Sequence, residues 1–74
     1  MKELDDYFIE IEEIRPPLPT GQKYAAKVKY FYVQTGNERK KIELTFGEVY
    51  GETGIEAEQK AVYQIKKWLE NNQV

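Results

Sequence analysis

The strongest constraint on the fold is an amphipathic stretch over residues 54–71, near the carboxyl end of the chain. Thr53 precedes it as an N-cap, and Glu56 follows three residues later, the spacing of a capping box. At about 100° per residue, one apolar stripe centres on Ile65. Its other members are Ala61, Val62, Trp68 and Leu69. A helix with such a stripe has to cover another element, and a sheet is the obvious one.

Two residues of this helix break its pattern. Glu58 falls on the apolar face, about one turn before Val62, and we expect its carboxylate to reach water or a cation. Tyr63 falls on the solvent face among lysines, where we expect its ring to pack on lysine stems.

Three segments before the helix alternate apolar and polar residues as half-buried strands do, over about residues 7–14, 22–33 and 39–46. The prolines within 15–21 cannot continue a ladder and predict a stiff connection, with a polyproline ligand as the alternative. Short links favour an antiparallel meander with 22–33 in the middle. We therefore predict a single α+β domain over 1–74, in which three antiparallel strands carry one C-terminal helix packed on one face.

Alternation in the middle strand places Phe31 and Val33 on the face opposite the helix, and Phe8 of the first strand joins them there. Tyr30 and Tyr32 then face the helix. Apolar residues on an open sheet face are typical of a binding surface. Phe8, Phe31 and Val33 are therefore the predicted partner-binding residues.

The same faces predict the hairpin register. A two-residue loop at Gly36–Asn37 sets Phe31 opposite Ile42 and mixes the apolar and charged faces. A longer loop of odd length, centred on Asn37, sets Tyr32 opposite Ile42 instead. We therefore expect a loop of three or five residues, by the usual lengths of hairpin loops.

The missing residue types exclude several chemistries. The chain has no Cys, His or Ser, so Ser–His and Cys–His catalysis and zinc sites built from His or Cys are impossible. The carboxylates do not obviously converge on a metal site, and we expect no enzyme, no cofactor and no bound metal. No apolar run approaches the ~20 residues that span a bilayer, and no signal-peptide pattern opens the chain. We expect a cytoplasmic protein without membrane contact.

Charge is distributed unevenly along the chain. Residues 1–14 hold six acids and one lysine, whereas residues 15–41 hold seven bases and one acid. Bases interleaved with aromatic residues in the hairpin suit contacts with single-stranded nucleic acid. The candidates for that role are Lys27, Lys29, Arg39, Lys40 and Lys41. The alternative explanation of the uneven charge is that these bases pair with the acids of the first strand.

Residues 51–69, with Gly51-Glu52-Thr53 before Ala57, Ile65 and Trp68-Leu69, resemble the loop and helix of HicB-type antitoxins. The resemblance implies a partial RNase H-like fold and an antitoxin role. The proline-rich element of that family is absent, because 45–49 is Thr-Phe-Gly-Glu-Val, and we expect no DNA-binding tail after the helix.

The strand–strand–strand–helix order is also similar to the end of double-stranded-RNA-binding domains. That family has lysines at the helix start, where this chain has Glu56 and Glu58, which would repel phosphate.

The expected function is a small non-catalytic protein-binding module, antitoxin-like or a phage-type inhibitor. It would use the open sheet face to bind a protein partner or a second copy. Nucleic-acid binding through the basic and aromatic hairpin is the alternative.

Overall fold

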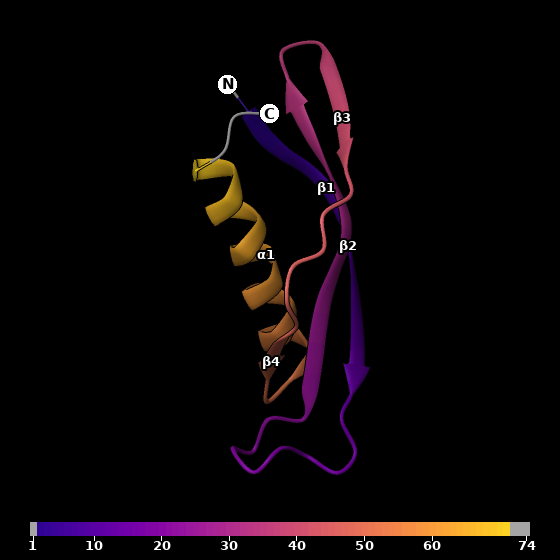
Figure 1. Cartoon of the computed structure of the whole chain (residues 1–74), viewed down its shortest axis with the longest axis vertical. Helices are drawn as coiled ribbons and strands as arrows, with labels where there is room; N and C mark the ends of the chain where they lie inside the picture. Colours follow the sequence, from indigo (N-terminus) through magenta and orange to yellow (C-terminus); the bar gives the residue numbers. More distant parts are fainter. Residues whose placement is uncertain (1, 72–74) are drawn as a thin grey trace.

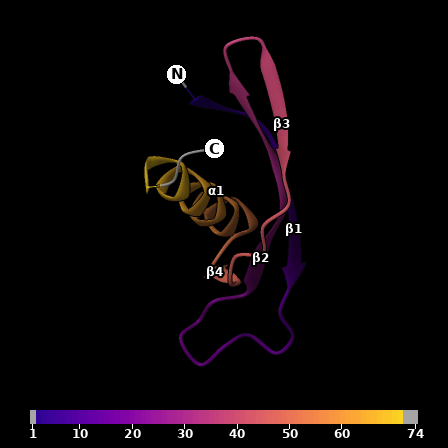
Figure 2. The ribbon, with the colours of Figure 1, turned by 45° about the horizontal axis from the view of Figure 1, so that its top comes forward.

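The computed structural model describes residues 2–71 and has the α+β architecture expected from the sequence (Figure 1). The elements are β1 (Lys2–Glu13), β2 (Tyr24–Thr35), β3 (Glu38–Ile42), β4 (Val49–Gly51) and α1 (Gly54–Asn71). The sheet is antiparallel in the order β1-β2-β3, and the short β4 also pairs with β2. The helix lies along one face, and the β2–β3 hairpin extends past its end (Figures 1 and 2).

The helix begins and ends at capping residues. The Thr53 Oγ1 accepts a hydrogen bond from the Glu56 N–H at 3.1 Å, as an N-cap does. The Glu56 side chain forms an ion pair with Lys60, one turn later. At the other end, the Asn71 Nδ2 donates to the Lys67 carbonyl at 3.0 Å. The sequence predicted the range 54–71, and the second expected stop residue, Asn72, lies outside the described residues.

The central strand contains one extra residue. Phe8 pairs with Tyr30, but the next residue of β1, Ile9, pairs with Val28, so Lys29 of β2 has no partner in the register. Such a bulge reverses the alternation of side chains beyond it. A second shift, between Leu4 and Asp6, lies in β1.

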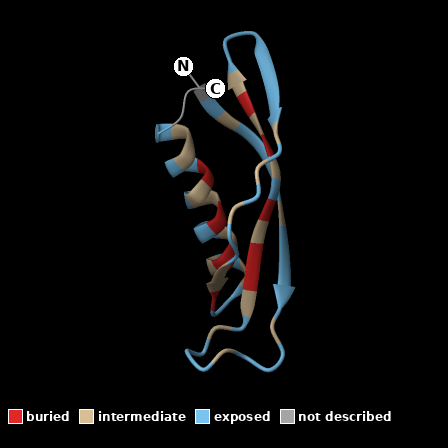
Figure 3. Cartoon of the chain, viewed as in Figure 1, coloured by how far each residue is buried: buried red, intermediate tan, exposed pale blue. Residues whose placement is uncertain are grey.

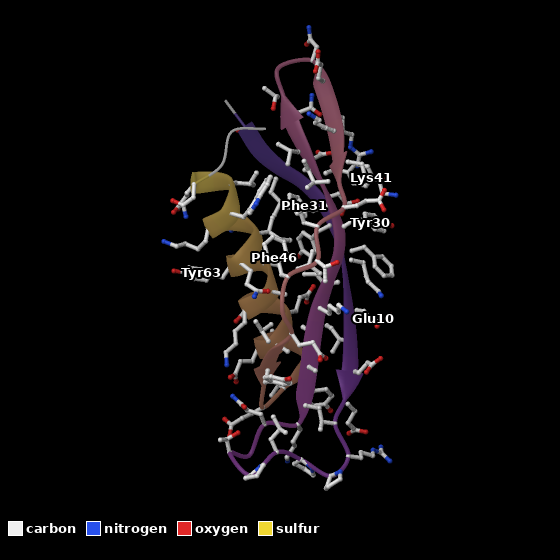
Figure 4. All side chains as sticks on the ribbon, in the orientation of Figure 1. Glu10, Tyr30, Phe31, Lys41, Phe46 and Tyr63 are labelled. Atoms are coloured by element: carbon white, nitrogen blue, oxygen red, sulfur yellow. The ribbon has the colours of Figure 1, made fainter. Side chains whose placement is uncertain are left out.

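The bulge overturns the predicted faces of β2. Phe31 is 0% exposed and Val33 is 1% exposed, and both lie in the core under α1. The Phe31 ring meets Trp68 edge-on, with 5.6 Å between the ring centroids. The prediction that Phe31 and Val33 lie on the open face is therefore wrong, because a pattern of period two has no means of showing an extra residue. Tyr30 projects from the open face instead (Figure 4).

The hairpin prediction fails for the same reason. Phe31 pairs with Ile42 and Thr35 pairs with Glu38, so the loop has the two residues Gly36 and Asn37. Gly36 has a φ of 60°, as the first central residue of a type II′ turn does. Because Phe31 faces the helix, its pairing with Ile42 joins a core residue to one that packs against the core, and no longer loop is needed.

The strands also differ in length from the predicted ranges. β1 begins at Lys2 rather than near residue 7, and β3 ends at Ile42 rather than near residue 46. Phe46 leaves the sheet but still packs against the core, from the irregular segment that leads to β4.

Small residues let the start of the helix approach the sheet. Ala57 and Ala61 are fully buried on α1, and Ala26 is buried on β2. The helix approaches the backbone still more closely at Gly51, because a Cβ there would lie 2.6 Å from the Ala57 backbone nitrogen.

Gly51→Ala should lower the free energy of unfolding by ~1–3 kcal/mol, the usual cost of forcing a methyl group into a packed interior. Thermal and urea unfolding measure this change. Gly47→Ala is the matched control, since a Cβ at Gly47 meets nothing within 4 Å. Equal effects of the two changes would contradict the close approach at Gly51.

Phe31→Ala should lower the free energy of unfolding by ~3–5 kcal/mol, as truncation of a buried Phe does. Phe8→Ala should cost much less, because Phe8 is 50% exposed on the other face (Figure 3 shows the burial along the chain). Urea unfolding of both variants compares them directly. A larger loss for Phe8→Ala would reverse the faces of β2.

Candidate functional site

Within residues 2–71, the edge strand β1 pairs with β2 alone. The Ile14 N–H donates to the Lys23 carbonyl at 2.7 Å, which fixes the direction of the backbone groups. Because these directions alternate, Tyr7, Ile9 and Ile11 present their N–H and C=O groups away from β2. The Tyr7 N–H agrees with this assignment, since it donates to the Asp6 Oδ1 at 2.8 Å. One side of β1 is therefore an open backbone edge.

A groove runs between this edge strand and α1. Its first part has a volume of about 400 Å³ and is lined by Tyr7, Ile55, Glu58, Gln59, Val62, Tyr63 and Lys66. A second part of about 630 Å³ is lined by Glu3, Leu4, Lys66, Leu69 and Glu70. Lys66 lines both parts, so they follow one another along the helix. We call the two parts together the β1–α1 groove.

Exposed apolar side chains gather along this groove. Ile55 is 70% exposed and Tyr63 is 61% exposed on α1, while Tyr7 and Ile11 are 37% and 40% exposed on β1. Ile11 lies beside the helix start, since a Cβ on Gly54 would be 3.9 Å from its Cγ2. An apolar patch of this kind beside a strand edge that pairs with no further strand is typical of an interaction site.

The groove explains the two residues that broke the helical pattern. Glu58 is half-buried in its wall, and no ion pair reaches its carboxylate from any described residue. The Lys67 Nζ lies 6.0 Å from the centre of the Tyr63 ring, and the ring stays largely exposed. These two exceptions were the clearest indications of the groove in the sequence.

The opposite face of the sheet carries an aromatic row, made of Phe8, Tyr30 and Tyr32. The Phe8 and Tyr30 rings stack at 5.4 Å with 12° between their planes, and Tyr32 meets Tyr30 edge-on at 5.8 Å. The Lys41 Nζ lies 4.4 Å above the Tyr30 ring and the Arg39 Cζ lies 4.0 Å above the Tyr32 ring. Figure 4 shows Tyr30, Lys41 and Glu10 projecting on this side, away from the helix.

The aromatic row gathers some of the predicted nucleic-acid residues. Arg39 and Lys41 lie over its rings, and Lys29 precedes Tyr30 in β2. Each of the three has an acidic neighbour: Glu10 lies 3.9 Å from Lys29, Asp5 bonds Arg39, and Glu43 lies 3.9 Å from Lys41. These are exposed ion pairs, which hold their partners weakly.

The other two predicted bases, Lys27 and Lys40, do not lie over the rings of the aromatic row. Lys27 pairs in register with Glu10. Lys40 pairs with Val33 and therefore faces the helix side of the sheet, apart from the row. The structure thus places two of the five bases, Arg39 and Lys41, over the rings of the row.

Among residues 2–71, no three acidic side chains lie close enough together to hold a metal ion. That part of the chain also has no helix long and apolar enough to cross a membrane. Comparisons with protein-family models, with curated proteins and with solved structures found no match.

Proposed function

We propose that the chain is a non-catalytic protein-binding module that holds an extended segment of a partner beside β1. The observation that supports this function is the open backbone edge of β1 next to the exposed apolar side chains of the β1–α1 groove. An added strand would bond to the main chain of β1, and the groove would accept every second side chain.

Tyr7, Ile9 and Ile11 would supply the backbone groups for this added strand. Their side chains point toward the helix side, so the neighbouring side chains of the partner would also point there and contact Ile55 and Tyr63. The proposed site is thus one edge of the sheet rather than its open face. An antitoxin-like or inhibitor role would use the same edge to hold a segment of its target.

A selection from a display library of random linear peptides tests this function. Enriched peptides should shift the backbone amide resonances of Tyr7, Ile9 and Ile11. The double change Ile55→Gln and Tyr63→Gln should weaken their binding about tenfold or more, as loss of an apolar anchor does. It should leave the melting temperature nearly unchanged, because both side chains are mostly exposed.

Tyr32→Thr, on the other face, is the matched control and should retain binding. Failure to enrich peptides, or peptides that shift only residues of the aromatic row, would count against the groove.

The aromatic row favours a second function, binding of single-stranded nucleic acid. Its three rings are adjacent, and cations lie over two of them. Bases stack on such rings while cations contact phosphates. The acidic neighbours of these cations make this function the weaker proposal.

If the row binds nucleic acid, oligothymidine should bind less tightly as salt is raised, because counterions are released on binding. Phe8→Ala should weaken that binding about tenfold, through loss of one stacking ring. Ile55→Gln, in the groove, should leave it unchanged. Fluorescence anisotropy measures all three proteins, and binding that is indifferent to Phe8→Ala would remove this function.

A further inference from the structure

The strand at the open edge is strongly acidic. Residues 2–13 hold six carboxylates and one lysine. Asp6 and Glu12 are exposed, and across the described part of the chain neither forms an ion pair. Glu58 adds another such carboxylate in the wall of the groove. Any segment that lies along β1 therefore meets excess negative charge.

The acids on β1 have a defined direction. Asp6, Phe8, Glu10 and Glu12 alternate with Tyr7, Ile9 and Ile11, so they point to the side of the sheet away from the helix. The two sides of an added strand would thus meet different surroundings. One side would meet apolar groove residues. The other would meet the carboxylates of Asp6, Glu10 and Glu12, of which Glu10 lies 3.9 Å from the Lys29 Nζ.

A second copy of β1 fits this edge poorly. In antiparallel pairing of two β1 strands, the acids at 6, 10 and 12 of one copy would lie opposite acids or Phe8 of the other in most registers. Like charges directly opposite one another destabilise a strand pair. The charges of β1 therefore oppose self-pairing, as charged edges do in many sheets.

The Asp6 carboxylate adds a local barrier to pairing. It accepts the Tyr7 N–H, one of the groups that an added strand would need. A cationic side chain on the incoming strand would draw this carboxylate away and free the N–H. A neutral or acidic strand would have to displace the carboxylate without that compensation.

We propose, on the basis of the protein-binding function above, that the β1–α1 groove accepts a basic extended segment of another protein. Apolar side chains of this segment alternate with Lys or Arg. The apolar set enters the groove beside Tyr7 and Ile55, and the basic set lies against Asp6, Glu10 and Glu12.

Two synthetic peptides of equal length test the proposal against the full chain, one alternating Val with Lys and the other alternating Val with Glu. The Val–Lys peptide should slow hydrogen exchange at the amides of Tyr7, Ile9 and Ile11, and the Val–Glu peptide should not. The affinity of the Val–Lys peptide should fall as salt is raised. The double change Glu10→Gln and Glu12→Gln should weaken binding of the Val–Lys peptide about fivefold, as loss of two exposed ion pairs does.

Ile11→Pro separates strand pairing from general attraction of a basic peptide to an acidic surface. It removes an edge N–H that points away from β2, so it breaks no bond of the existing ladder. It keeps every carboxylate, and the Val–Lys peptide should nevertheless lose most of its affinity. Ile11→Thr keeps the N–H and should bind more tightly than Ile11→Pro. Equal binding to both would overturn the proposed strand pairing.

The remaining outcomes distinguish the two proposals. Equal protection of β1 by both peptides would overturn the charge preference and leave the protein-binding function standing. Protection by neither peptide, in a protein whose display selection also fails, would overturn that function as well. Protection of the three amides that rises with protein concentration in the absence of peptide would identify a second copy as the occupant and overturn this inference.

Discussion

The extra residue in β2 decides which side chains the helix covers. Before Lys29, the inward residue is Val28, and after it the inward residue is Phe31. With strict alternation, Phe31 would face solvent and Tyr30 would lie under the helix. The bulge instead buries the apolar ring of Phe31 against Trp68 and leaves the tyrosines, whose hydroxyls suit water, on the open face.

The sequence was a good guide wherever the structure follows from local rules. Caps and a stripe of period 3.6 predicted the helix at 54–71, and three alternating segments predicted the antiparallel meander with its helix on one face. It was a poor guide to the faces of β2, because one unpaired residue reverses every later position. The error at Phe31 then passed to Val33 and to the hairpin register, since all three depended on the same alternation.

The candidate site was harder to predict than the fold. A free strand edge is a property of the assembled sheet. No residue of β1 shows on its own that one side of this strand will lack a pairing partner. The helix contributed the better indications, because Glu58 and Tyr63 did not fit a helix that simply covers a sheet. Glu58 and Tyr63, the exceptions to the amphipathic pattern, line the groove. Phe31 and Val33, which first suggested a binding surface, lie in the core instead.

The core side chains of α1 increase in size along the helix, from Ala57 and Ala61 through Ile65 to Trp68. The helix accordingly lies close to β2 at its start and diverges from it toward its end (Figure 1). Its inclination is therefore set by a wedge of core side chains, and the same inclination positions Ile55 and Tyr63 over β1. Side-chain volume in the core and the width of the groove are thus mechanically coupled, so that a substitution buried under the helix can still change the shape of the groove.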